Sequence, residues 1–177
     1  MIIPIRFIGS GGQGNVLAAY IIGDAAVRYG LNAVQTAMYS AQVRGAPTRA
    51  DVIISDGDIY DVRAEEPIYL IVMSQSAVYA FKNTKPKIVI AESNVSEIPM
   101  RYEKLYKVDA INIAKSLGSL NVQNMVFLGF LVKLLGIIPI DVVEQSIRDN
   151  VSSKWAELDI KALREGYKLA EEICKTS

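Results

Sequence analysis

The sequence predicts an α/β fold in three layers: a mixed, mostly parallel sheet flanked by helices, with a glycine-rich loop after the first strand. Two features of the 177-residue chain predict it. Short runs rich in Ile and Val alternate with longer segments of helical character, which is typical of α/β proteins. An Asp-Gly pair after the third run favours a hairpin, so we expect some antiparallel pairing. No repeat or linker interrupts the chain, and we expect one domain over residues 1–177.

The first third of the chain predicts three strands and one helix. Residues 2–8 are mostly β-branched and end at a glycine, so we expect a strand. Residues 15–29 are rich in Ala, Leu and Ile and predict a helix that ends at Gly30. Residues 32–39 alternate between apolar and polar positions and predict the second strand, and residues 51–55 predict the third.

The middle of the chain continues the alternation. After Pro67, the uninterrupted apolar run IYLIVM predicts a buried strand. Ser74 is a candidate N-cap of a short helix over SQSAVYAF. Residues 87–92 and 102–108 predict two more strands, and Asp109 is a candidate cap of a helix over INIAKSLG.

From Asn121 onward the chain predicts helices only. The first reaches about Leu135, the second follows Pro139, and the third is an amphipathic segment over residues 155–174. Its apolar positions recur at helical spacing, so we expect them to pack in the core, with a partner interface as the alternative. These positions are Trp155, Leu158, Leu163, Tyr167 and Leu169.

Composition excludes several kinds of site. Nineteen basic residues balance nineteen acidic ones, which argues against a dedicated nucleic-acid-binding protein. The chain has no histidine, and Cys174 is its only cysteine, so it cannot by itself hold an iron–sulfur cluster or a usual zinc site. Ser55, Asp56 and Asp58 offer oxygen ligands, but a tight turn explains them better than a metal. No segment indicates a signal peptide or membrane span, and we expect a cytoplasmic protein.

The glycine-rich loop is the clearest candidate site. Gly9, Gly11 and Gly14 satisfy the pattern G-x-G-x-x-G between a strand and a helix, where amides at a helix N-terminus can bind phosphate. An ordinary dinucleotide site also needs an acid at the end of the second strand, and residues 34–36 contain none. No Lys-Ser/Thr pair follows the last glycine, which excludes a P-loop. A tight turn that only packs the helix against the sheet remains the alternative.

A second candidate lies in the loop YSAQVRGAPTR. Arg44 and Arg49 flank Gly45 and suit an anion, although both could equally be solvated loop cations. Tyr39, at the end of the second strand, could stack on an adenine or simply pack. Because ligands of open α/β sheets collect at one edge, we expect this loop to lie beside the glycine loop.

Together these segments resemble a known family. The stretch GSGGQG, followed by VQTAMYSAQVRGAPTRADVIISDGDI, resembles the gamma subunit or domain of the 2-oxoacid:ferredoxin oxidoreductases. That family shows G-x-G-G-Q-G, a loop Tyr-Gly-x-Glu-x-Arg-Gly-Gly, Ile-Ser-Asp before an acidic turn, and an N-x-x-x-x-G element, here Asn124 and Gly129. Ser40, Gln42 and Ala46 depart from the second motif, where the family has Gly, Glu and Gly.

The resemblance implies a subunit of an enzyme that oxidatively decarboxylates a 2-oxoacid to an acyl-CoA. It implies that partner alpha, beta and delta subunits carry thiamine diphosphate and the iron–sulfur clusters, and that ferredoxin accepts the electrons. This chain would carry no catalytic residue and would be inactive alone, while contributing to coenzyme A binding and to assembly. The residues that the resemblance places at the coenzyme are Gly9, Gly11, Gly12, Gln13, Gly14, Tyr39, Arg44 and Gly45.

Two questions stay open at this point. The segment AVQT-x-x-Y and the separate short chain favour 2-oxoglutarate over pyruvate as the substrate, and an indolepyruvate-type enzyme is a third choice. The alternative function is a stand-alone nucleotide-binding or regulatory module.

Overall fold

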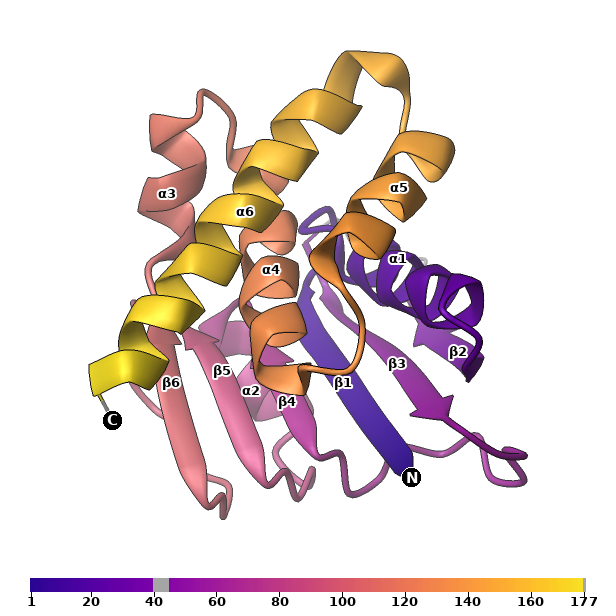
Figure 1. Ribbon diagram of the computed structural model, residues 1–177. Helices are drawn as coiled ribbons and strands as arrows, with labels where there is room; N and C mark the ends of the chain where they lie inside the picture. The colour runs from indigo at the N-terminus through magenta and orange to yellow at the C-terminus, as the bar shows by residue number, and fades with distance from the viewer. Residues whose placement is uncertain (40–44, 177) are drawn as a thin grey trace.

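The computed structural model describes residues 1–39 and 45–176. Within them, six strands form one sheet in the order β2-β3-β1-β4-β5-β6 (Figure 1). β1 pairs in parallel with β4, and β4, β5 and β6 continue the parallel part. The strands are β1 (Ile2–Ser10), β2 (Asn32–Met38), β3 (Pro47–Ser55), β4 (Tyr69–Val72), β5 (Ile88–Glu92) and β6 (Lys104–Val108).

The predicted mixed, mostly parallel sheet is confirmed, but the hairpin proposed at Asp56-Gly57 is wrong. The antiparallel part arises because β3 lies between β1 and β2 and runs against both. After β3 the chain passes to β4, on the other side of β1. The turn residues instead secure the start of the chain: the Asp56 carboxylate lies 2.7 Å from the N-terminal amine, and Ser55 Oγ donates to the Met1 carbonyl at 2.9 Å.

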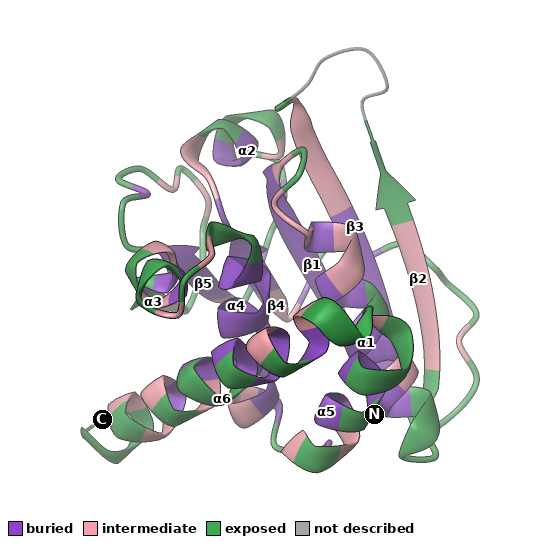
Figure 2. Cartoon of the chain, turned by 90° about the horizontal axis from the view of Figure 1, so that it is seen from above, coloured by how far each residue is buried: buried purple, intermediate pink, exposed green. Residues whose placement is uncertain are grey.

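Helices cover the two faces of the sheet very unequally (Figures 1 and 2). The larger core packs one face against five helices. The short α2 is the only helix of residues 1–39 and 45–176 on the other face, where it packs with the segment after β5 on a small cluster around Ile8, Leu70 and Val89. The helices are α1 (Asn15–Arg28), α2 (Gln75–Ala80), α3 (Ala110–Ser116), α4 (Gln123–Leu135), α5 (Ile140–Asn150) and α6 (Ser153–Thr176). The expected layers are therefore present, with one of them thin.

Element boundaries follow local chemistry except at β3. α1 ends where predicted, because Gly30 has φ +89° and the Leu31 amide donates back to the Ala26 carbonyl at 2.9 Å. β3 begins at Pro47, four residues earlier than expected, since its first residues pair with the end of β1. Pro47 is tolerated there as the first residue of the strand. No helix in the described part of the chain is long and apolar enough to cross a membrane.

α4 and α6 form the tightest helix pair. A Cβ added at Gly129 of α4 would overlap the carbonyl oxygen of Leu163, and one added at Gly166 of α6 would overlap that of Val126. The two backbones therefore touch at a reciprocal pair of glycines. The expectation that the last helix packs in the core is confirmed for Leu163, which is buried, and for Leu158, Tyr167 and Leu169, which pack against the core; Trp155 is half-buried and does not belong to the core.

Candidate functional site

The glycine-rich loop lies where it was predicted, between β1 and α1. Gly12 and Gly14 have φ of +89° and +82°, in the left-handed region that favours glycine. The Gln13 amide donates to the Ser10 carbonyl at 3.1 Å, which closes a tight turn at the end of β1. The loop sequence is thus required by backbone geometry at two of its glycines.

Gln13 braces this turn from inside. Its side-chain Oε1 accepts from the Ser10 amide at 2.7 Å, and its Nε2 donates to the Met73 carbonyl at 3.3 Å, just after β4. Gly9 is needed for the same reason, because a Cβ there would lie 2.6 Å from Gln13 Oε1. The resemblance places Gln13 at the coenzyme. In the structure, both the oxygen and the nitrogen of its side-chain amide hold the shape of the loop.

Asn124 supports the loop from α4. It is buried, its Nδ2 donates to the Gly14 carbonyl at 3.2 Å, and a Cβ added at Gly14 would overlap its side chain. Asn15 ties the start of α1 to β3 through a 2.7 Å bond from Nδ2 to Thr48 Oγ1. The N-x-x-x-x-G element thus has a physical meaning: its Asn supports the loop, and its Gly lets α4 lie against α6.

The N-terminus of α1 is open to an anion. Gly14 occupies the N-cap position without a side-chain capping bond, and no acidic residue lies in the first turn. Within residues 1–39 and 45–176, no hydrogen bond joins the amide of Gly12 or of Gly14. Free amides and the helix dipole both favour negative charge at this position.

The second predicted loop does lie beside the first. The Gly11 amide donates to the Ala46 carbonyl at 2.9 Å, and Gly45 is exposed with φ +82°. Tyr39 is exposed at the end of β2. Arg44, with Ser40 and Gln42, falls in residues 40–44, outside the described residues.

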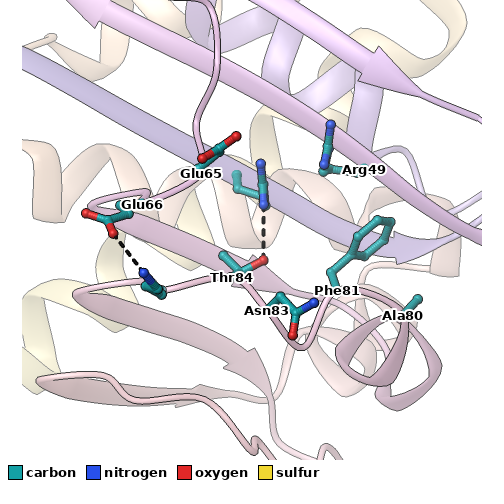
Figure 3. A pocket seen from close by; sticks show the side chains of 9 residues that line it. Arg49, Glu65, Glu66, Ala80, Phe81, Asn83 and Thr84 are labelled. Atoms are coloured by element: carbon teal, nitrogen blue, oxygen red, sulfur yellow. Dashed lines mark hydrogen bonds and ion pairs between the residues drawn. The ribbon is translucent and has the colours of Figure 1, made fainter.

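Arg49 does not join the glycine loop. It lies in β3 on the face covered by α2, with Nε 3.5 Å from Asp51 Oδ2 and its guanidinium 5.9 Å from the centre of the Phe81 ring. It lines a pocket of about 390 Å³ together with Arg6, Glu65, Glu66 and Thr84 (Figure 3). Asp51 faces the two arginines and Glu66 lies 3.2 Å from Lys85, so the pocket has balanced charge and nothing marks it as a phosphate site.

The sequence did not predict that three hydroxyl groups gather near the loop. Ser10 Oγ lies 3.2 Å from Ser74 Oγ and 3.3 Å from Ser76 Oγ, at the ends of β1 and β4. Ser74 occupies the predicted N-cap position of α2, but its side chain makes no capping bond. β1 and β4 pair in parallel, and this brings the three hydroxyl groups together. The sequence alone does not indicate which strands are neighbours in the sheet.

No metal site is found in the described part of the chain, where no group of three or more His, Cys, Asp or Glu side chains could hold an ion. At the turn after β3, the carboxylate of Asp58 accepts from the Tyr60 hydroxyl at 2.9 Å. The turn interpretation of Ser55, Asp56 and Asp58 agrees with these contacts.

Comparison with known proteins places this architecture. The family described as pyruvate ferredoxin/flavodoxin oxidoreductase matches residues 4–169. The 2-oxoglutarate synthase subunit KorC of Methanothermobacter thermautotrophicus is 33% identical over 179 residues, 95% of either chain. The pyruvate/ketoisovalerate oxidoreductases common subunit gamma of Pyrococcus furiosus is 31% identical, covering 96% of this chain and 97% of that one. The crystal structure of a keto/oxoacid ferredoxin oxidoreductase gamma subunit from Geobacter sulfurreducens superposes with a TM-score of 0.84 at 31% identity, covering 97% and 98% of the two chains.

Proposed function

The chain belongs to the pyruvate ferredoxin/flavodoxin oxidoreductase family as a gamma subunit, and we propose that it forms one wall of the coenzyme A site of the assembled enzyme. The resemblance seen in the sequence is confirmed. The assembly oxidises a 2-oxoacid, and we propose 2-oxoglutarate as its substrate, with a pyruvate-type acid as the alternative. Relatives of both kinds match at similar identity.

The open N-terminus of α1 is the observation that carries the coenzyme proposal. Coenzyme A bears several phosphates, and the loop presents the amides of Gly12 and Gly14 on a backbone held by Gln13 and Asn124. The adjoining loop would add Tyr39, Arg44 and Gly45 around the same phosphates. A rigid, uncapped helix start needs no rearrangement to accept an anion.

The redox cofactors belong, in this proposal, to partner subunits. One cysteine and no histidine leave this chain without the ligands of an iron–sulfur cluster. We place thiamine diphosphate and the clusters in the alpha, beta and delta subunits, and ferredoxin accepts electrons from the assembly. The gamma subunit then contributes by binding coenzyme A and by contacting the other subunits.

A Gly12→Ala variant is expected to raise the KM for coenzyme A at least about tenfold in the assembled enzyme, about 1.4 kcal/mol of lost binding, while the KM for the 2-oxoacid stays unchanged. The added Cβ strains a residue in the left-handed region, at the amide that we propose as a phosphate contact. Steady-state kinetics with each substrate varied in turn measures both constants.

Gly30→Ala is the matched control for this experiment. Gly30 has the same φ of +89° and the same open surroundings, but it lies at the opposite end of α1. Both variants should lose similar stability, and only Gly12→Ala should change the KM for coenzyme A. Equal changes in the KM for coenzyme A in the two variants would show that the glycine-rich loop does not contact the coenzyme.

A groove between α1 and the edge strand β2 is our candidate for a contact with another subunit. Tyr20, Gly23, Asp24 and Val27 form one stripe of α1, and with β2 they line a hollow of about 230 Å³. Tyr20 and Val27 are 46% and 55% exposed. Exposed Tyr20 and Val27 beside β2, which is an edge strand among the described residues, form the kind of surface that a subunit interface covers.

A Val27→Glu variant is therefore expected to weaken co-purification of the partner subunits with tagged gamma chain by about tenfold or more, since a buried unpaired charge is costly. Val62→Glu makes the same change at a valine of comparable exposure, 46%, in the segment after β3. If the two variants bring down the same amount of partner, the α1–β2 groove does not form the interface.

A further inference from the structure

Asp159 of α6 is a buried carboxylate that the described residues leave unpaired. It is 6% exposed, and neither a hydrogen bond nor an ion pair joins its side chain within residues 1–39 and 45–176. Burial alone raises the pKa of this carboxyl to about 6. The Asp159 oxygens are not among the fully buried atoms that lack a partner, so the carboxylate is withdrawn from bulk water but still open to the hollow it lines, where a ligand could donate to it.

The Asp159 carboxylate lines a hollow of about 240 Å³. The other residues that line the hollow are Leu17, Asn121, Val122, Asn124, Val151 and Trp155. Trp155 is half-buried, so its indole forms part of the wall and part of the opening. Pockets for drug-sized ligands measure about 300–1,000 Å³, so this hollow suits a single flat ring rather than a whole nucleotide.

The hollow borders the glycine-rich loop. Leu17 lies in the first turn of α1, and Asn124 is the residue that donates to the Gly14 carbonyl. Asn124 therefore belongs at once to the hollow and to the support of the phosphate-facing loop. A ligand whose phosphates lie on the loop has this hollow beside it.

We propose that the hollow between α1, α4 and α6 is the base subsite of the coenzyme site, where Asp159 accepts a hydrogen bond from the exocyclic amino group of adenine and Trp155 stacks on the ring. The inference rests on the proposed coenzyme A function and specifies where the nucleoside lies. A carboxylate is an acceptor only and so selects the amino edge of adenine. Stacking on an indole face is available to any base, so specificity falls to Asp159.

Charges around the hollow agree with this arrangement. The Lys154 ammonium lies 5.6 Å from the centre of the Trp155 ring, and Lys154 itself is exposed and does not line the hollow. It can approach a phosphate without entering the hollow. Among the described residues that line the hollow, Asp159 alone carries a charge, so an entering amino group meets an acceptor without a competing cation in the lining.

The test compares coenzyme A with its analogue in which hydrogen replaces the 6-amino group of the adenine. The wild-type assembly is expected to use coenzyme A with a KM about tenfold lower than that of the analogue, because a hydrogen bond to a charged acceptor is lost. In Asp159→Leu the two KM values should become equal. Asp159→Asn keeps an acceptor oxygen and should show an intermediate ratio.

Glu157→Leu removes a carboxylate from the exposed side of the same helix and should leave the ratio as in the wild type. A wild-type ratio near one, with Gly12→Ala still raising the KM for coenzyme A, would overturn the base subsite and leave the coenzyme wall intact. If neither Gly12→Ala nor Asp159→Leu changes that KM, the proposed function itself fails. Reduced subunit co-purification by Asp159→Leu, without a change in the ratio, would assign the hollow to a basic side chain of a partner and overturn the proposal.

Discussion

A Gly129→Ala variant is expected to lower the free energy of unfolding by about 3 kcal/mol or more, although alanine is normally the better helix former. In an exposed helix the same change would stabilise by about 1 kcal/mol. Here the new Cβ would overlap the Leu163 carbonyl oxygen, which is backbone and cannot turn aside. α4 and α6 must separate, and overpacked cores lose about 1–3 kcal/mol, occasionally more.

Gly23→Ala provides the control, at a buried glycine of α1. Its Cβ would meet Val52 Cγ2 at 3.4 Å and Ala33 Cβ at 3.8 Å, which are ordinary contacts. We expect Gly23→Ala to be neutral or stabilising in chemical denaturation, and Gly166→Ala to resemble Gly129→Ala, since a Cβ there would overlap the Val126 carbonyl oxygen. A Gly129→Ala protein as stable as Gly23→Ala would show that the helices are not in backbone contact.

The helix contact also reaches the site. α4 carries both Gly129 and Asn124, and Asn124 holds the Gly14 carbonyl. Moving α4 away from α6 would therefore shift the support under the glycine loop, and would open the hollow that Asp159 lines. Gly129 thus links core packing to ligand binding at a distance from the loop.

Local signals in the sequence were sufficient for most of the elements and for the loop. The glycine cluster after a β-branched run predicts the turn at Gly11 to Gly14, and Gly30 predicts the end of α1. Both depend on backbone conformations that only nearby residues decide. The sequence-based predictions were wrong or incomplete where a residue's structure depends on contacts with residues far away in the chain.

β3 and the site's supports are such cases. Thr48 and Arg49 look like loop residues, yet pairing with β1 and β2 makes them a strand and turns Arg49 toward α2. Gly166 lies in an amphipathic helix whose pattern gives no sign of a backbone contact with Val126. Asp159 resembles a solvated helix carboxylate until α1, α4 and α6 are assembled around it.

The second large effect is expected at Arg6, on the face of the sheet that α2 covers. Arg6 and Asp51 are 5% and 3% exposed, and two bonds join them, from Nε to Oδ1 at 2.8 Å and from Nη2 to Oδ2 at 2.9 Å. Nη1 also donates to Thr84 Oγ1 at 3.0 Å, at the base of the pocket in Figure 3. Arg6→Met should lower the free energy of unfolding by about 3–5 kcal/mol, because Asp51 loses its main partner in the interior.

The loss of about 3–5 kcal/mol expected for Arg6→Met is an upper range, because Arg49 Nε lies 3.5 Å from Asp51 Oδ2 and remains as a second cation beside the carboxylate. The double variant Arg6→Met/Asp51→Leu should recover much of the loss, because a buried ion pair often contributes little beyond what apolar residues would. The exposed pair Arg63–Asp61 has the same two-bond geometry at 3.0 Å, and Arg63→Met should leave the denaturation midpoint unchanged. If Arg6→Met lowers stability no more than Arg63→Met does, burial does not determine the strength of the Arg6–Asp51 interaction. If the double variant is no more stable than Arg6→Met, the loss of stability does not come from an unpaired Asp51.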